Sequence, residues 1–241
     1  MAIYRQAADG QFVPFESTPF PDLEKKLEDW IELNPHLLLD GEPLAVIARQ
    51  PRNEHGKFLD LLAVDRTGAT VVVELKRGEA PRDVLAQAFE YAAWVDSLSF
   101  DQLDELGREY AARRGIDAAG LHDLYSRVFG EDGPDEAPVD PAVVTFNSRQ
   151  RIVVVAESFT PEVLQTARYF RSRMSADVHA VKFLVHRAGS ETVLETSAVV
   201  GQEPVRAAAV PREQPQTDDE YRLSVATDFM RAASTLRTGP H

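Results

Sequence analysis

The sequence contains no cysteine and no long apolar run, and each absence excludes a class of protein. A chain of 241 residues without cysteine has no disulfides, no thiolate zinc site and no cysteine nucleophile. Nowhere do about 18 apolar residues follow one another, as a membrane-spanning helix requires, and residues 1–12 lack the apolar core of a signal peptide. We therefore expect a cytoplasmic protein with no membrane segment.

The signatures of several enzyme classes are missing as well. There is no GxxxxGK[ST] loop, no GxGxxG after a strand and no GxSxG, so nucleotide-driven and serine-hydrolase chemistry lack their usual motifs. The six histidines show no HExxH or other close ligand spacing. No zinc site is therefore predicted.

Positive charge is scarce, since 26 Lys and Arg residues stand against 39 Asp and Glu residues and the net charge is −13. This balance argues against the broad basic surface of a non-specific nucleic-acid binder. It still permits a local basic groove, because six basic residues gather in one stretch of the chain: Arg49, Arg52, Lys57, Lys76, Arg77 and Arg82.

Apolar spacing predicts a first helix followed by a three-stranded antiparallel meander. Residues 23–33 repeat apolar side chains at helical intervals and end before an Asn-Pro pair. Three runs rich in Val, Ile and Leu follow, with polar turns between them, at residues 44–48, 58–64 and 69–75. A helix that starts near Pro81 completes the order αβββα.

The second half of the chain adds a βαβ unit and further helices. Residues 101–130 predict a helical insertion in a domain that spans residues 1–200. The βαβ unit is predicted from a strand at 151–156, a helix at 160–174 and a strand at 178–186. Residues 201–219 predict a linker, and residues 220–241 predict an amphipathic C-terminal helix. We expect this helix to bury its apolar stripe on the domain or against a second copy of the chain, and we favour a homodimer.

Asp60, Glu74 and Lys76 form the candidate catalytic centre. If the second and third strands pair through the turn at residues 65–68, both carboxylates reach one end of the sheet, and strand alternation places Glu74 and Lys76 on one face. Two carboxylates suit Mg²⁺ or Mn²⁺, which completes its shell with water and a substrate phosphate. A nearby lysine orients the attacking water or stabilises developing charge. The three residues together predict phosphodiester hydrolysis.

The alternative is that these residues are ordinary charges at strand ends, where acids and lysines are common. The flanking residues 58–64 and 69–73 are apolar, however, and a charge within such a strand costs free energy of burial. This context favours the catalytic interpretation.

Further segments make the pattern more specific. They are Glu24 to Trp30, Asn34-Pro35, Arg49-Gln50, Gly56 to Asp65, Val72 to Gly78 and Gln87 to Tyr91. Together they resemble the nuclease motifs of PD-(D/E)XK enzymes related to the NucS/EndoMS endonucleases, over roughly residues 20–200.

The resemblance implies an α/β, restriction-endonuclease-like core with a mixed β-sheet flanked by helices, a divalent metal and DNA as the substrate. In the family pattern Asp60 and Glu74 match the metal-binding acids and Lys76 matches the catalytic lysine. Gln87 and Tyr91 match the QxxxY pattern of the RecB-like branch and share one helix face, although Tyr91 also belongs to the apolar stripe. A separate N-terminal dimerisation and DNA-binding domain is not recognisable, so mismatch specificity is not transferred.

The first helix offers two candidates for a further catalytic acid, Glu24 and Glu28. At about 100° per residue, Glu24 lies about 75° from the centre of the apolar stripe and Glu28 about 115°. Glu24 is therefore the better placed to face inward. A solvated helix charge is an equally good interpretation of it.

These observations predict a metal-dependent DNA endonuclease or exonuclease in repair or in defence against foreign DNA. The competing hypothesis is a nuclease-fold module for nucleic-acid binding or assembly, with weak or no catalysis. A basic channel leading to Asp60 favours the enzyme, and an acidic surround favours the assembly role.

Overall fold

The computed structural model describes residues 4–6, 10–14, 16–17, 23–131, 133, 138–188 and 191–202. All of them belong to one compact unit, Met1–Ala207. The predicted C-terminal helix at 220–241 and all but the first two residues of the predicted linker lie outside the described residues. Both stay predictions, as does the homodimer that depends on this helix.

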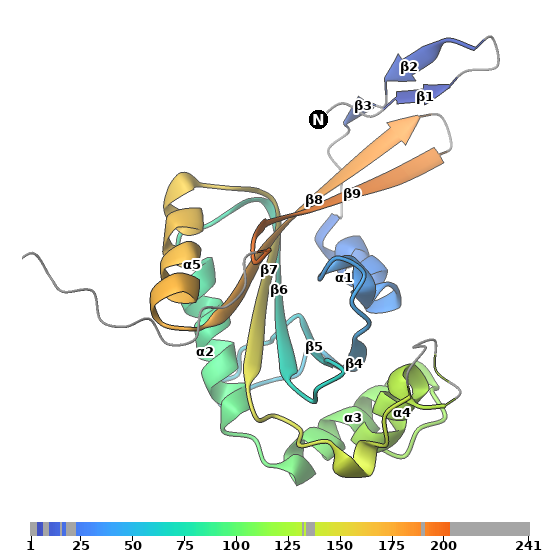
Figure 1. Ribbon diagram of the computed structural model, residues 1–241, viewed down its shortest axis with the longest axis vertical. Helices are drawn as coiled ribbons and strands as arrows, with labels where there is room; N and C mark the ends of the chain where they lie inside the picture. The colour runs from blue at the N-terminus through green and yellow to red at the C-terminus, as the bar shows by residue number, and fades with distance from the viewer. Residues whose placement is uncertain are drawn as a thin grey trace, which may run out of the picture. The chain divides into compact units, whose positions relative to one another are not determined.

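A mixed sheet of seven strands carries the fold, in the order β3-β8-β7-β6-β5-β4 with β9 beside β8 (Figure 1). Its strands are β3 (Glu16–Ser17), β4 (Ala45–Arg49), β5 (Leu61–Val64), β6 (Thr70–Ala80), β7 (Gln150–Phe159), β8 (Asp177–Ala188) and β9 (Glu191–Val200). The strands β4, β5 and β6 form an antiparallel meander, β6, β7 and β8 run parallel, and β9 returns antiparallel to β8. A separate short hairpin pairs β1 (Tyr4–Gln6) with β2 (Phe12–Pro14).

Helices cover both faces of the sheet, with α1 on one side and α2 and α5 on the other (Figure 1). The α-helices are α1 (Leu23–Leu33), α2 (Val84–Asp96), α3 (Phe100–Arg114), α4 (Leu121–Phe129) and α5 (Pro161–Arg173), and the short 3-10 helices are η1 (Pro35–Leu37) and η2 (Pro141–Val143). The face under α1 has its own apolar cluster, which includes Leu27, Ile31 and Leu75. A larger cluster joins α2, α3, α4 and α5 to the opposite face. Among the described helices, none is both long and apolar enough to span a bilayer.

The order α1-β4-β5-β6-α2, followed by β7-α5-β8, confirms the predicted restriction-endonuclease-like core. The helices α3 and α4 stand where the helical insertion was expected. The strand predicted from residue 58 begins only at Leu61, because residues 51–59 form a loop with its own hydrogen bonds. The strand predicted to end at residue 75 continues to Ala80, because its far end pairs with β7. Strand β9 was not predicted.

The turn between β5 and β6 sets the alignment of the two strands. The Asp65 side chain accepts hydrogen bonds from the backbone N–H of Thr67 at 2.8 Å and of Ala69 at 3.1 Å, and Gly68 adopts a positive φ of 81°, as Asx-type turns favour. Leu61 then pairs with Val73. The next pair outward in this register is Asp60 with Glu74.

Candidate active site

Gln50, Asp60 and Glu74 lie in one row across three neighbouring strands, just outside β4 and β5 and within β6. We call this row the catalytic row. Arg49 is the register partner of Leu61, and one step outward the Gln50 N–H donates to the Asp60 carbonyl at 2.9 Å. Asp60 itself stands one residue before β5, which corrects the expectation that it lies within the strand. Directly opposed residues of antiparallel strands share a face of the sheet, so the register brings the two carboxylates together.

The structure brings Lys76 to the same place. Its Nζ lies 2.5 Å from Glu74 Oε1, on the face that strand alternation predicted. Leu75 points to the opposite face, where it is buried, and its backbone N–H donates to Asp60 Oδ2 at 2.7 Å. Glu74 is almost inaccessible, with 1% of its surface exposed. Such complete burial of a charged side chain within a strand is unusual.

Burial raises the pKa of Asp60 to about 7, and the negative charges of Glu74 and Glu28 contribute in the same direction. The N–H of Leu75 and the charge of Lys76 oppose this rise without cancelling it. A desolvated site with surplus negative charge is stabilised by an added cation or proton.

Glu28 of α1 lies near Asp60, since its negative charge contributes to the raised pKa of Asp60. It is 5% exposed, and its carboxylate accepts hydrogen bonds from Arg49 at 3.1 Å and from Gln50 at 3.1 Å. Helical spacing alone placed Glu28 farther from the apolar stripe than Glu24, and that argument did not foresee its burial. The burial of this charge is compensated by its two hydrogen-bond partners, at the end of β4 and one residue beyond it. The side chain of Glu24 lies outside the described residues, so its proposed role stays a prediction.

Gln87 and Tyr91 share a face of α2, as their spacing predicted, and Gln87 Nε2 donates to Tyr91 Oη at 3.4 Å. The Tyr91 hydroxyl donates to the Phe58 carbonyl at 2.6 Å, while its ring is buried. Tyr91 therefore fastens the loop that leads into Asp60. It acts as a positioning residue in this arrangement, and the catalytic role that the family pattern implies for Gln87 and Tyr91 stays a prediction.

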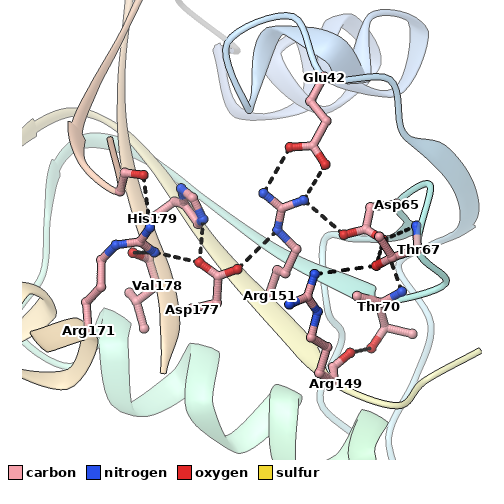
Figure 2. A network of polar contacts seen from close by, with 12 residues as sticks. Glu42, Asp65, Thr67, Thr70, Arg149, Arg151, Arg171, Asp177, Val178 and His179 are labelled. Atoms are coloured by element: carbon pink, nitrogen blue, oxygen red, sulfur yellow. Dashed lines mark hydrogen bonds and ion pairs between the residues drawn. The ribbon is translucent and has the colours of Figure 1, made fainter. Parts of the chain in front are cut away.

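A second cluster of buried charges lies at the opposite end of β5 and differs in its electrostatics (Figure 2). Its members are Glu42, Asp65, Arg151, Arg171, Asp177 and His179. Arg151 lies 3.0 Å from Asp65 and 3.4 Å from Asp177. Burial alone raises the pKa of Asp177, but the hydrogen bond and charge of His179, followed by the hydrogen bond of Arg171, outweigh it and hold the pKa below its ordinary value.

The comparison of the two clusters identifies the catalytic row as the candidate site. In the second cluster each acid has a cationic partner, as in a structural ion-pair network. At the catalytic row the three carboxylates of Glu28, Asp60 and Glu74 lie beside the cations Lys76 and Arg49. Arg49 is also shared with two further acids on α1, Asp29 at 2.5 Å and Glu32 at 2.7 Å. Strongly perturbed carboxylates with a specific set of neighbours are typical of functional sites.

The donor set of the catalytic row fits a hard divalent cation. Within the described part of the chain, no three His, Asp or Glu side chains gather closely enough to hold a metal ion by themselves. Asp60 and Glu74 offer two carboxylates in a site with surplus negative charge. This suits Mg²⁺ or Mn²⁺, which retain water and bind substrate phosphate, better than a metal that needs a full set of protein ligands.

Sequence reasoning missed the roles of Arg49, Gln50 and Phe58. The sequence placed Arg49 in a basic stretch and Arg49-Gln50 in a family pattern, but neither observation predicted that the two residues are the hydrogen-bond partners of the buried Glu28. Gln50 has a φ of 49°, an uncommon conformation for a residue other than glycine. No sequence signal for this conformation was available, because Gln does not favour it.

No family model and no curated protein matches this chain. Two solved structures are similar to it. One is the crystal structure of a repair endonuclease from Pyrococcus abyssi, with 20% identity over 65% of this chain and 47% of that chain, at a TM-score of 0.35. The other is an EndoMS–dsDNA complex, with 16% identity over 70% of this chain and 50% of that chain, at a TM-score of 0.37. This chain spans about half the length of each.

Proposed function

We propose that this protein is a divalent-metal-dependent deoxyribonuclease that acts in DNA repair or in defence against foreign DNA. The observation that supports it is the catalytic row, in which two opposed, desolvated carboxylates, Asp60 and Glu74, lie beside Lys76. DNA as the substrate rests on the resemblance of the sequence motifs to NucS/EndoMS-type nucleases.

Asp60 and Glu74 would hold the ion, which supplies Lewis-acid activation of a phosphoryl oxygen and a more acidic bound water. The ammonium of Lys76, at 2.5 Å from Glu74 Oε1, orients a water at this carboxylate or stabilises charge that develops on the phosphate. Glu28, fixed by Arg49 and Gln50, maintains the negative potential that attracts a cation. Tyr91 keeps Asp60 in place through the Phe58 carbonyl.

Cleavage of DNA by the full chain tests the proposal. With Mg²⁺ or Mn²⁺ we expect cleavage of at least one substrate in a panel of single-stranded, duplex, branched and mismatched DNA, with RNA included for comparison. EDTA should abolish it. Asp60→Asn and Glu74→Gln should each lower the rate by about 100-fold or more, since each removes a charged ligand. Glu105→Gln, an exposed acid on α3, is the matched control and should cleave like the wild type.

Calorimetric titration with Mn²⁺ separates binding from chemistry. Asp60→Asn and Glu74→Gln should weaken Mn²⁺ binding, whereas Lys76→Ala should retain it and lose turnover. If both acid variants match the wild type in Mn²⁺ affinity and in cleavage across the panel, the nuclease proposal is wrong. A binding or assembly role for the fold would then take its place.

A further inference from the structure

A pocket of about 310 Å³ opens beside the catalytic row and has no part in the chemistry described above. Its lining residues are Arg49, Gln50, Phe58, Tyr110, Arg113 and Arg114. Gln50 belongs to the row itself, and Phe58 lies two residues before Asp60. The remaining wall comes from α3, the first helix of the insertion. The lining therefore combines three arginines and two aromatic rings with Gln50 of the catalytic row, and it contains no acid.

Phe58 is a large apolar side chain kept at the surface by a well-ordered loop. Its exposed fraction is 55%. The loop closes through hydrogen bonds from Asn53 N to Lys57 O at 2.9 Å and from Leu59 N to Pro51 O at 3.1 Å, and Tyr91 Oη binds the Phe58 carbonyl. The Arg52 guanidinium lies 5.9 Å from the centre of the ring. The backbone hydrogen bonds thus hold the Phe58 ring exposed in the wall of the pocket.

The arginines of the pocket differ in how they are held. Arg49 and Arg114 each form an ion pair with Glu32 of α1, whose side chain is largely buried. Arg113 is exposed, and its guanidinium makes one long hydrogen bond, to the Glu109 carbonyl at 3.4 Å, and no ion pair with any residue that the structure describes. Arg113 is therefore the pocket cation best able to accept a new anionic partner.

We infer that this pocket binds one unpaired nucleotide of the strand that enters the catalytic row, with its base stacked on Phe58 and a flanking phosphate bound by Arg113. Stacking on an aromatic side chain requires a base whose face is free, which a base inside a regular duplex does not offer. A guanidinium is well matched to a phosphate. The inference rests on the proposed function and gives the inserted helix α3 a part in substrate binding.

Binding measured in EDTA tests the pocket separately from catalysis. The full chain is titrated into fluorescein-labelled DNA, either a single strand, a duplex with one unpaired nucleotide or a fully paired duplex, and the anisotropy is followed. Phe58→Ala should weaken binding of the first two substrates about tenfold and leave binding of the paired duplex unchanged. Phe58→Trp should restore binding. Tyr169→Ala is the control, since this tyrosine is 58% exposed on the distant helix α5.

Arg113 has its own readout. Arg113→Ala should weaken binding and lower the salt dependence, as the slope of log Kd against log salt, by about one. Arg173→Ala removes an exposed arginine of α5 and should change neither quantity. A 2-aminopurine base at the unpaired position should lose fluorescence on binding to the wild type, and this quenching should disappear in Phe58→Ala.

The outcomes are distinguishable. Equal binding by Phe58→Ala and Tyr169→Ala, with both proteins folded by circular dichroism, overturns the pocket whether or not the protein cleaves DNA. Binding that depends on Phe58 in a protein that never cleaves DNA keeps the pocket and overturns the nuclease proposal. No binding to any of the three DNA substrates overturns the pocket, and the nuclease proposal is then decided by the cleavage panel alone.

Discussion

Asp60 and Asp177 show how strongly the surroundings of a carboxylate decide its behaviour. Both are largely buried, and burial raises the pKa of each. At Asp177, His179 and Arg171 reverse the effect. At Asp60 the neighbouring Glu74 adds to it, and the pKa reaches about 7. The fold thus tolerates an unfavourable charge at Asp60, as is common at functional sites.

This difference predicts how stability depends on pH. Because the pKa of Asp60 is 3.8 in its ordinary state and about 7 when folded, the folded protein binds a proton more tightly than the unfolded chain between these values. Asp60 therefore lowers the free energy of unfolding as pH rises from about 4 to 7, by at most about 4 kcal/mol.

Asp60→Asn removes the titrating group and should raise stability at pH 8, with little change at pH 5. Urea unfolding in EDTA at both pH values measures the effect. Addition of Mg²⁺ should stabilise the wild type at pH 8 and not the variant. A variant no more stable than the wild type at pH 8 would show that Asp60 titrates normally.

Tyr91 allows a test of whether one hydrogen bond holds the loop that positions Asp60. Tyr91→Phe keeps the buried ring and removes the bond to the Phe58 carbonyl. We expect a loss of about 1 kcal/mol in the free energy of unfolding and a several-fold loss of cleavage, with an unchanged pH profile. A shifted pH profile would instead assign the hydroxyl to proton transfer.

Among the elements, the β5–β6 hairpin matters most, because its register opposes Asp60 to Glu74. Gly68 permits the turn through its positive φ of 81°, and an added Cβ would meet Val144 Cγ1 at 2.5 Å and the Thr145 carbonyl oxygen at 2.8 Å. A side chain at this position is therefore strained both by its backbone conformation and by its neighbours.

Gly68→Ala should destabilise the protein by more than about 2 kcal/mol, because the backbone at Thr145 has to move. Gly115 ends α3 with a φ of 64° and has nothing within 4 Å of an added Cβ, so Gly115→Ala should cost only about 1 kcal/mol. Thermal unfolding of both variants makes the comparison. Equal losses would mean that the contact with residues 144–145 is not important.

The inserted helices α3 and α4 are held by a helix cap and by close packing against each other, which suits a part in substrate binding. Ser99 and Gln102 form a capping box at the start of α3. Gly107 allows close packing of α3 on α4, since an added Cβ would lie 3.2 Å from the backbone nitrogen of Leu121. The helix that carries Arg113 is thus fixed by its cap and by its neighbour.

At the scale of the whole molecule, the net charge of −13 does not describe the local charge of the surface around Phe58. The α1 acids Glu28, Asp29 and Glu32 form ion pairs with Arg49 or Arg114, while Arg52 and Arg113 remain exposed around Phe58. A strongly acidic protein can therefore present a local cationic pocket, because screening limits the reach of distant charges to about 10 Å.

Assembly is also a property of the whole molecule, and it depends on residues outside the described ranges. Because the amphipathic pattern at 220–241 needs an apolar partner, deletion of residues 205–241 should lower the mass from dimer to monomer in light scattering, or else lower the melting temperature of the domain. Unchanged mass together with unchanged melting temperature would contradict both forms of the prediction.

The sequence by itself determined the order of the core elements from α1 to β8, the bounds of α1 and the positions of the two acids and the lysine, because helical and strand periodicity and turn chemistry act over short stretches of chain. It also indicated the hairpin turn at Asp65 that sets the spacing between Asp60 and Glu74.

Only the tertiary structure decided that Glu28 is buried, how far β6 extends, that β9 pairs with β8, and that Phe58 and Arg113 line one pocket. Each depends on partners far along the chain: Arg49 and Gln50 for Glu28, β7 for the end of β6, and α3 for the pocket. The free energy of burying a charge or extending a strand is set by these partners, and no local pattern at Glu28 or Phe58 specifies them.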